Sequence, residues 1–336
     1  MSVRLGVAII GLGNAFEPHA KSLRDLLDRV DVRWAAAPSG DRLQDVAARH
    51  VFPVTTDIDQ AIADPEVAAV ILLSPANTHL ELARRCFALG KHVLCEKPLD
   101  ITIERAERLV EAGRGAGLRL GVVLQSRFRP GSVRLRRALQ AGTLGRIEAA
   151  SLVVPWWRPQ EYYDEPGRGT RWRDGGGVLL TQAIHALDLF RSLVGVREVS
   201  AAQVATTALH RMETEDYAAA LVRLGNGAPG TIMATTAAYP GSAEVIRVIG
   251  TEGSAWLSGG ALRVSLLDGT REVVEDQGGS GGGASVMAFS HDAHRDLISD
   301  FVDAIEEERD PAVTGEEALA SQRLVDAILA KARGTS

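Results

Sequence analysis

Over the first third of the chain, short apolar runs alternate with longer segments in which apolar residues recur every three or four positions. The longer segments predict helices with one apolar face, as the spacing of Leu80, Ala83 and Phe87 illustrates. Strands separated by such helices are typical of a doubly wound α/β fold with a parallel sheet, which we assign to residues 1–125. The short runs predict strands covered on both faces, at residues 3–10, 31–37, 67–74, 91–96 and 118–124.

The pattern changes after about residue 145, where strand-like segments follow one another with only turns between them. This succession predicts antiparallel pairing. One helix is expected at residues 178–193, and two more close the chain over 291–332. Residues 126–336 are therefore expected to form an α+β domain with a large, open, mainly antiparallel sheet. The glycine-rich residues 278–285 predict a mobile loop.

Length, charge and cysteine content narrow the class of protein. A chain of 336 residues suits two domains, and its net charge of -6 argues against a nucleic acid or an anionic membrane as partner. No apolar run approaches the roughly 20 residues that span a bilayer, and no signal peptide is recognised, so a cytoplasmic protein is expected. Two cysteines do not suggest a disulfide framework. No ligand spacing typical of a metal site is present, and no metal is expected.

A glycine turn follows the first expected strand. Gly11 and Gly13 precede a helix there, and the backbone N–H groups of such a turn, together with the helix dipole, bind the pyrophosphate of a dinucleotide. The fingerprint of this site has a third Gly or Ala where this chain has Phe16. Asn14, Ala15 and Phe16 complete the expected cofactor-binding turn. A plain strand-to-helix turn is the alternative.

The end of the second expected strand bears on which cofactor binds. An acidic residue there would accept hydrogen bonds from the adenosine ribose. This chain has Ala37, Pro38 and Ser39 in that neighbourhood. No carboxylate would repel a 2′-phosphate, and Ser39 and Arg42 could bind one. The sequence therefore favours NADP over NAD, with either cofactor possible.

Four motifs occur in the order SPANTH (74–79), GKHVLCEKP (90–98), RFRP (127–130) and DGGGVLLTQAIHALDL (174–189). In sequence and order they resemble the Gfo/Idh/MocA family of oxidoreductases, which includes glucose-fructose oxidoreductase and inositol dehydrogenase. The resemblance covers essentially the whole chain. It implies a Rossmann domain followed by a domain with a large open antiparallel sheet that commonly mediates dimers or tetramers. A homodimer or homotetramer is therefore expected.

The resemblance also implies roles for residues of the first domain. Lys97 would lie beside the nicotinamide and the substrate hydroxyl, and its bond to Pro98 is often cis in that family. A lysine just past the carboxyl end of a parallel strand independently suits a ligand crevice. His79 could instead be a packing or capping residue, and a surface lysine is the alternative for Lys97. The residues expected along the cofactor are Ser74, Pro75, Asn77, His79, Glu96, Lys97 and Pro98.

Oxidation of an alcohol by a nicotinamide also needs a base for the hydroxyl proton, and histidine suits that role near neutral pH. His185 shares one predicted helix face with Thr181 and Asp188. A lone histidine on an apolar helix is often a core residue, but the resemblance implies an acid/base role with Lys97. Relatives commonly have an aspartate where Thr181 stands, and a hydroxyl cannot supply its charge. Residues 175–177 are expected to let the backbone approach the nicotinamide or substrate.

Aromatic and arginine residues gather in residues 155–174. Aromatic faces stack on sugar rings, and arginines bind carboxylates or phosphates. We expect the substrate to be a cyclic polyol, a sugar or an anionic sugar derivative, with aryl dihydrodiols still possible. A sheet-edge loop or a subunit contact is the alternative. The candidate substrate-binding residues are Trp156, Tyr163, Arg168, Trp172 and Gln182.

These observations predict an NAD(P)-dependent dehydrogenase or reductase that acts on a secondary hydroxyl or ketone. Its candidate catalytic residues are Lys97, His185 and Thr181. An NAD-dependent glycosidase, an aryl dihydrodiol dehydrogenase and a non-catalytic cofactor-binding protein are the alternatives.

Overall fold

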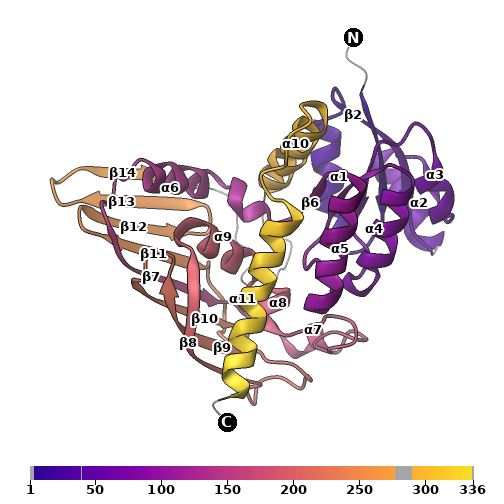
Figure 1. The fold of residues 1–336 in the computed structure, drawn as a ribbon. Helices are drawn as coiled ribbons and strands as arrows, with labels where there is room; N and C mark the ends of the chain where they lie inside the picture. Colours follow the sequence, from indigo (N-terminus) through magenta and orange to yellow (C-terminus); the bar gives the residue numbers. More distant parts are fainter. Residues whose placement is uncertain (1–3, 39, 277–289, 335–336) are drawn as a thin grey trace. The chain divides into compact units, whose positions relative to one another are not determined.

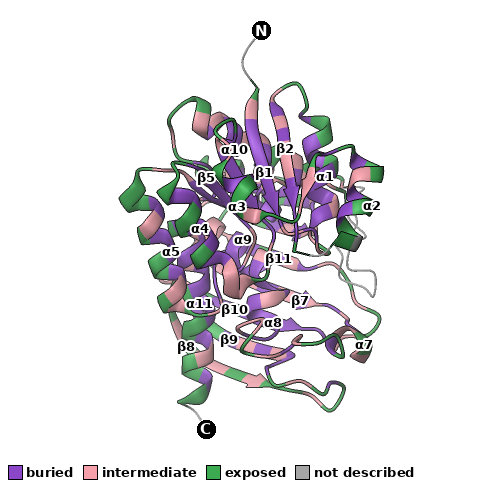
Figure 2. Ribbon diagram, turned by 90° about the vertical axis from the view of Figure 1, so that its right-hand side faces the viewer, coloured by how far each residue is buried: buried purple, intermediate pink, exposed green. Residues whose placement is uncertain are grey.

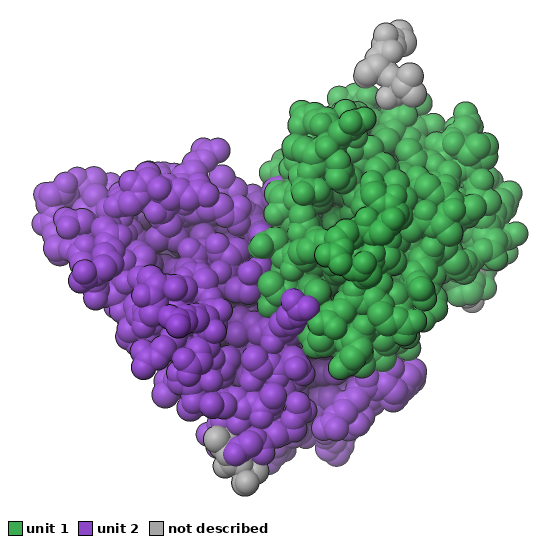
Figure 3. Space-filling model, in the orientation of Figure 1, with its two compact units in different colours: residues 1–124, 291–320 green, residues 125–290, 321–336 purple. Residues whose placement is uncertain are grey.

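The computed structural model describes residues 4–38, 40–276 and 290–334 (Figure 1). The chain divides into two compact units (Figure 3). The first comprises residues 1–124 and 291–320, and the second comprises residues 125–290 and 321–336. Two expectations from the sequence, the role of Ser39 and the mobile loop at 278–285, lie outside the described residues.

The first unit is built on a parallel sheet of six strands in the order β3-β2-β1-β4-β5-β6. Its strands are β1 (Leu5–Ile10), β2 (Val30–Ala36), β3 (Val54–Thr55), β4 (Ala69–Leu72), β5 (His92–Cys95) and β6 (Leu120–Val122). Its helices are α1 (Phe16–Asp25), α2 (Gly40–His50), α3 (Ile58–Ala63), α4 (His79–Ala88), α5 (Ile103–Ala116) and α10 (Asp292–Glu306), with a 3-10 turn, η1 (Ala76–Thr78). The predicted doubly wound sheet is confirmed. The chain order reverses between β1 and β4, so a ligand crevice belongs at their carboxyl ends.

Two features of this unit differ from the sequence expectation. The two-residue strand β3 was not predicted, because so short a run carries no periodicity. Helix α10 belongs to this unit rather than to the second domain. Arg29, just after α1, lies 2.6 Å from Asp303 and 2.7 Å from Glu306 of α10. An amphipathic pattern predicts that a helix buries one face, but it does not say which core the helix covers.

The second unit contains an eight-stranded sheet in the order β14-β13-β12-β11-β7-β10-β9-β8 (Figure 1). Only the β7 and β10 pair is parallel among these neighbours, so the predicted mainly antiparallel sheet is confirmed. Its strands are β7 (Ile147–Pro155), β8 (Val196–Ala205), β9 (Tyr217–Leu224), β10 (Pro229–Thr235), β11 (Val245–Gly250), β12 (Gly253–Ser258), β13 (Ala261–Leu266) and β14 (Arg271–Val274).

Burial follows the two hydrophobic patterns. In β1 the residues from Gly6 to Ile10 are buried in succession, whereas β10 alternates between exposed and buried positions over most of its length (Figure 2). One face of the eight-stranded sheet therefore faces the core of its unit and the other carries more exposed side chains. The helices after the first unit's sheet are η2 (Gln125–Phe128), α6 (Pro130–Gln140), α7 (Gln160–Tyr163), α8 (Val178–Thr181), α9 (Ile184–Val194) and α11 (Gly315–Arg333).

The single helix expected at 178–193 is two helices, α8 and α9. The N–H groups of Gln182 and Ala183 both donate to the carbonyl of Val178, at 3.2 and 2.8 Å. Since Ala183 bonds five residues back rather than four, the regular helical ladder is interrupted there. Thr181 and His185 thus lie on consecutive helices rather than on one continuous face.

Candidate active site

The glycine turn has the geometry expected of a pyrophosphate site. Gly11 follows β1 directly and has a φ of +102°, and a Cβ built on it would lie 2.6 Å from the carbonyl carbon of Leu73. Only glycine fits such a position. Helix α1 begins at Phe16 with no side-chain cap from Ala15. The N–H of Phe16 donates to the carbonyl of Gly13 at 3.0 Å and Pro18 has no N–H, so an anion would be bound there by the other N–H groups of the glycine turn and by that of Glu17.

Phe16 contributes to this turn through its backbone. Its side chain is buried, and its ring lies edge-on to His50 of α2, with 5.4 Å between the ring centres. The aromatic ring at the position of the third glycine thus packs between helices. The expected place of Phe16 in the cofactor-binding turn stays a prediction.

Arg42 brings a positive charge to the same turn. It lies on α2, is exposed, and donates from Nη1 to the carbonyl of Leu12 at 3.2 Å. A Cβ on Gly13 would lie 3.4 Å from the same nitrogen. The guanidinium therefore lies against the backbone between Gly11 and Gly13.

The loop after β4 is tied to the loop after β5 by His79. This side chain is buried, and its Nε2 lies 2.8 Å from the carbonyl oxygen of Ser74. Its Nδ1 lies 3.1 Å from the carbonyl oxygens of both Pro98 and Leu99. Both ring nitrogens therefore contact main-chain carbonyl oxygens. These contacts suit the packing role that was the alternative for His79. Beside it, Pro75 is exposed, and Ser74 and Asn77 are half-buried.

Lys97 follows β5 by two residues and is half-buried, and the Lys97–Pro98 peptide is cis. Its backbone N–H donates to Oε2 of Glu96 at 3.0 Å. Gly11, Ser74 and Lys97 therefore follow β1, β4 and β5, which are neighbours in the sheet. Since parallel strands end at the same edge, these residues share one edge of the sheet.

In the second unit, His185 is half-buried in the first turn of α9. Asp188, one turn further on, does not share its environment. The Asp188 carboxylate is buried and accepts from Nε and Nη2 of Arg127, both at 2.6 Å, and from the Ser321 hydroxyl at 2.7 Å. The prediction that Asp188 shares a polar helix edge with Thr181 and His185 is therefore wrong. Asp188 instead anchors α9 in the core.

The glycines before α8 are explained by packing. A Cβ on Gly177 would lie 1.9 Å from the carbonyl oxygen of Glu215, and that oxygen accepts from the N–H of Val178 at 2.8 Å. The Glu215 side chain accepts from the N–H of Leu179 at 3.3 Å, and burial raises the pKa of its carboxyl. A close backbone approach is thus made to Glu215 within the same unit, and the approach expected to the nicotinamide or substrate stays a prediction.

A cluster of aromatic and arginine side chains centres on Tyr162. The guanidinium of Arg168 lies 4.5 Å from the Tyr162 ring centre and donates to its hydroxyl at 2.9 Å. Buried Arg158 lies 5.8 Å from the same ring and 5.3 Å from the ring of Trp156. The buried indole N–H of Trp156 has no hydrogen-bond partner among the described residues. A buried donor of this kind suits a substrate oxygen.

Gln182 connects this cluster to Thr181. Its amide lies 3.4 Å from the Tyr162 hydroxyl on one side and contacts the Thr181 hydroxyl on the other. The Gln182 NH₂ donates to the Tyr162 hydroxyl. The Thr181 hydroxyl has one proton and lies within reach of both the Gln182 oxygen and the carbonyl of Gly177, the latter at 2.7 Å. Hydrogen bonds therefore connect Arg168, Tyr162, Gln182 and Thr181 in one chain.

The other two candidate substrate residues differ from this chain. Tyr163 is buried, its hydroxyl lies 2.6 Å from that of Thr236, and burial raises the pKa of its phenol. Trp172 is 64% exposed. Neither makes a contact with Gln182 or Arg168 in the hydrogen bonds described above.

The arginines of residues 155–174 are largely neutralised by acids. Arg168 and Arg173 both pair with Glu165, at 2.7 and 3.1 Å, and Arg171 lies 3.7 Å from Glu213. These pairs leave the segment less basic than its sequence suggested. An anionic substrate group would have to compete with them.

Sequence reasoning missed two buried histidine–carboxylate pairs. His19 lies 3.0 Å from Glu96 in the first unit, and His210 lies 2.7 Å from Asp216 in the second. The partners in the first pair are 77 residues apart, so no local signal could have indicated it. His210 also lies 2.8 Å from the carbonyl of Arg158 and so braces the aromatic segment.

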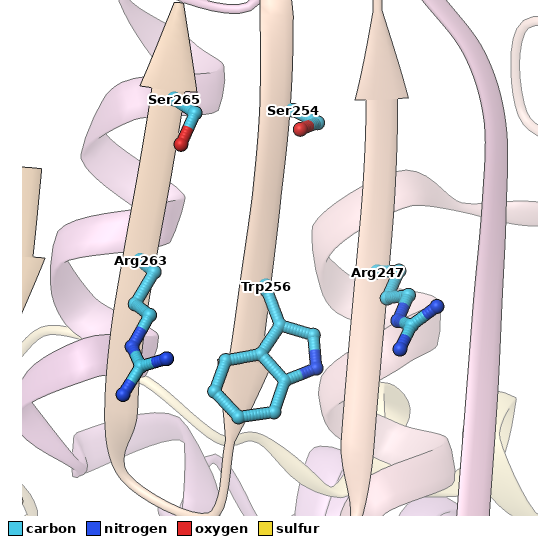
Figure 4. Close-up of a pocket in the computed structure, with 5 residues that line it drawn as sticks. All are labelled: Arg247, Ser254, Trp256, Arg263 and Ser265. Atoms are coloured by element: carbon cyan, nitrogen blue, oxygen red, sulfur yellow. The ribbon is translucent and has the colours of Figure 1, made fainter. Parts of the chain in front are cut away.

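A shallow pocket of about 320 Å³ lies elsewhere, on the eight-stranded sheet. Strand register aligns Arg247, Trp256 and Arg263 across β11, β12 and β13, with the indole between the two arginines (Figure 4). The Arg263 guanidinium lies 5.2 Å from the Trp256 ring centre, and Ser254 and Ser265 complete the lining. None of the candidate catalytic residues lines this pocket.

Two properties of the described residues concern membrane proteins and metal enzymes. No helix there is long and apolar enough to cross a membrane. No group of three or more His, Cys, Asp or Glu side chains there could hold a metal ion. Both cysteines, Cys86 and Cys95, are buried and free.

A doubly wound unit with a glycine turn after its first strand, joined to a unit with a large mixed sheet, defines the class of nicotinamide-dependent oxidoreductases. Residues 5–124 match the model of the oxidoreductase family with an NAD-binding Rossmann fold, and residues 132–256 match the GFO/IDH/MocA C-terminal domain. The chain belongs to this Gfo/Idh/MocA family, and the resemblance of its motifs is confirmed.

Characterised relatives of this chain are sugar and inositol enzymes. It is 28% identical to myo-inositol 2-dehydrogenase of Thermotoga maritima over 93% of this chain and 91% of the relative. It is 29% identical to 1,5-anhydro-D-fructose reductase of Ensifer adhaerens over 78% and 76% of the two chains. The WlbA dehydrogenase of Bordetella pertussis, solved with NADH and UDP-GlcNAcA, is 28% identical, with a TM-score of 0.85 over 99% of this chain and 98% of the other.

Proposed function

We propose that this protein catalyses reversible hydride transfer between a nicotinamide cofactor and a secondary hydroxyl of a neutral sugar or cyclic polyol. The observation that carries the proposal is the common sheet edge of Gly11, Ser74 and Lys97, which follow three neighbouring strands. A cofactor placed along that edge would accept or return the hydride. The names of the sugar and inositol relatives support the same reaction class.

Lys97 and His185 are the proposed proton-transferring groups. As a hydroxyl carbon loses hydride, its O–H proton must leave to a base, and in the reverse direction the same group returns it. Both side chains are half-buried, so each combines access to a small molecule with partial shielding from water. Thr181 would hold a substrate oxygen through its hydroxyl and cannot supply a charge.

The glycine turn fits a dinucleotide, because a Cβ at Gly11 is excluded and the turn lies at the start of α1, where the helix dipole favours a phosphate. Of the two cofactors, we favour NADP. No carboxylate ends β2, and Arg42 lies against the glycine turn. NAD remains the competing outcome of the test.

The substrate class follows from the charge balance of residues 155–174. Three of the four arginines there, Arg168, Arg171 and Arg173, pair with Glu165 or Glu213, which favours an uncharged substrate over a sugar acid. The unpartnered indole N–H of Trp156 and the amide of Gln182 offer the neutral hydrogen bonds that a polyol needs. A nucleotide-linked sugar acid, as in the WlbA complex, is the alternative substrate.

The purified protein, freed of bound cofactor, should be tested with NAD⁺ and NADP⁺ against inositols, xylose, anhydro-sugars and UDP-linked sugar acids. We expect cofactor reduction with at least one neutral compound. Arg168→Ala should not lower the rate with sugar acids more than it lowers the rate with neutral compounds. Reaction confined to sugar acids would contradict the substrate class. No reaction with either cofactor in either direction would contradict the proposed function. Release of an aryl glycoside without net cofactor reduction would instead indicate a glycosidase.

The exposed face of the eight-stranded sheet supports assembly into a homodimer or homotetramer. Leu221, Ile249 and Val273 lie on the face that carries Trp256, and each is more than half exposed. Exposed apolar side chains on a sheet face favour contact with another protein surface. Light scattering after size-exclusion chromatography should give two or four times the mass of 35.8 kDa, and a monomer would contradict this part of the proposal.

A further inference from the structure

A buried histidine in the first unit has no assigned role. His19 lies in the middle of α1, has no exposed surface, and its Nε2 is 3.0 Å from Oε1 of Glu96. Because an ionised carboxylate only accepts hydrogen bonds, Nε2 is the protonated nitrogen. The other nitrogen, Nδ1, has no hydrogen-bond partner in the described part of the chain. Among the described residues, its hydrogen-bond partner is therefore Glu96.

The two oxygens of Glu96 have different partners. Oε1 accepts from His19, and Oε2 accepts from the backbone N–H of Lys97 at 3.0 Å. Burial on its own would raise the pKa of this carboxyl, but the hydrogen bond from His19 and the charge of Lys97 hold that pKa below its usual range. The carboxylate thus remains charged and links a helix to the main chain of the candidate catalytic lysine.

The position of His19 on α1 connects two parts of the candidate site. Helix α1 begins at Phe16, next to the glycine turn, and His19 lies one turn further along. On its other side, the His19 ring lies edge-on to His294 of α10, with 5.3 Å between ring centres. The same rigid helix therefore carries the phosphate-binding turn at its start and the partner of Glu96 one turn later.

We propose that His19 is a positioning residue that, through Glu96, fixes the backbone of Lys97 relative to the glycine turn. The proposal rests on the proposed function, because it assumes the role given there to Lys97. It predicts that loss of His19 disturbs Lys97 while leaving the glycine turn able to bind cofactor. It also predicts a change in pH dependence.

The direction of that change follows from the groups that face Glu96, which are His19 from α1, Lys97 beside it and His294 from α10. Burial raises the pKa of Glu96, and His19, Lys97 and His294 lower it. Without His19, only Lys97 and His294 oppose the effect of burial, so the pKa of Glu96 rises. Protonation of Glu96 then begins at higher pH. In the direction of ketone reduction, where His185 donates its proton, activity on the acid side should be lost at a higher pH than in the unmodified protein.

The test compares His19→Leu and His19→Gln with a matched control, His50→Leu. His50 is also buried in the first unit, and its Nε2 lies 3.3 Å from the carboxylate of Glu17. The described hydrogen bonds and ion pairs of Glu17 do not include Lys97. His19→Leu should lower kcat roughly ten- to a hundredfold with a KM for cofactor within about threefold, and should move the acid limb of the pH profile upward. His19→Gln keeps a hydrogen-bond donor, so it should recover much of kcat and much of the original acid limb.

Backbone hydrogen exchange supplies a measurement that needs no activity. In cofactor-free protein, the amide of Lys97 should exchange faster in His19→Leu than in the unmodified chain or in His50→Leu. If exchange at Lys97 and the acid limb are both unchanged in a folded His19→Leu, the proposal is overturned. An inactive unmodified protein with faster exchange in His19→Leu would contradict the proposed function alone.

If His19→Leu does not fold, Glu96→Gln decides the matter. Glutamine keeps an oxygen for the Lys97 N–H but does not titrate. In the direction of ketone reduction, where His185 donates its proton, the acid limb that Glu96 sets should therefore disappear. An acid limb that persists unchanged in Glu96→Gln would overturn the proposal.

Discussion

In the first unit the candidate cofactor residues follow β1, β4 and β5 and are held mainly by main-chain geometry, whereas in the second unit the candidate substrate residues hold one another through side chains. Gly11 is required by backbone torsion and close packing. Tyr162, by contrast, is placed by Arg168 and Gln182. Main-chain contacts suit a cofactor whose phosphates are constant. Side-chain contacts can change from one relative to another, which suits a substrate that varies.

The largest expected effect is the loss of turnover in His185→Ala. If His185 transfers the substrate proton, kcat should fall by roughly 10²–10⁴-fold, the usual range for a general base. Cofactor affinity should stay the same, because no cofactor contact is assigned to His185. Steady-state kinetics and cofactor titration check both. Near-normal turnover in a natively folded variant would rule out this role.

Gly11→Ala should nearly abolish cofactor binding and also destabilise the protein. The new Cβ would lie 2.6 Å from the Leu73 carbonyl carbon, in a backbone conformation that L-residues rarely adopt. Gly90→Ala is a matched control, because Gly90 has a φ of +72° and nothing within 4 Å of the built Cβ. That control should lose only about 1 kcal/mol, the strain of a left-handed residue. Equal losses in the two variants would show that close packing at Gly11 is unimportant.

Arg42→Ala should lower the preference for NADP over NAD. Removing a guanidinium that binds a 2′-phosphate should cut kcat/KM for NADP by about tenfold, in line with a charge-assisted hydrogen bond, and change that for NAD little. The ratio of the two kcat/KM values is the measurement. An unchanged ratio would mean that Arg42 only supports the backbone at Leu12.

Tyr162→Phe and Tyr163→Phe should separate substrate binding from packing. Loss of the Tyr162 hydroxyl breaks the chain between Arg168 and Gln182, so KM for substrate should rise by roughly three- to tenfold. Loss of the Tyr163 hydroxyl leaves Thr236 unsatisfied in a buried place and should lower the melting temperature instead. If Tyr162→Phe lowered the melting temperature and Tyr163→Phe raised KM, Tyr163 would be the substrate-binding residue and Tyr162 the packing residue.

The smallest expected effect is on stability in Glu215→Gln. The pKa of Glu215 is raised in the folded protein, so the folded state holds this proton more tightly than the unfolded state. Its contribution to stability is complete below the unfolded pKa and is lost as the pH rises through the folded pKa. Glutamine keeps an acceptor for Leu179 and does not titrate. The variant should therefore melt roughly 2–4 °C above the unmodified protein at pH 8 and close to it at pH 4. A gap that shrank with rising pH would contradict the direction of the shift.

Much of the first unit could be predicted because its signals are local. Consecutive apolar residues, a glycine pair after a strand and a lysine after another strand all lie within a few positions of one another. Helix α10 could not be placed, because its apolar face suits either core. The break between α8 and α9 was missed because the side-chain pattern of residues 178–193 continues through it, while only the backbone bonding of Ala183 changes.

Apolar periodicity and turn chemistry were enough for the two sheets, the glycine turn and the position of Lys97 at a strand end, since these follow from steric and hydrophobic preferences of neighbouring residues. Contacts between distant residues depended on the tertiary structure. Asp188 became a core anchor because Arg127 reaches it, His79 became a brace between two loops, and Glu96 acquired His19 as partner. A hydrogen bond needs atoms within about 3.5 Å of each other, and only the packing of helices on the sheets brings such residues that close.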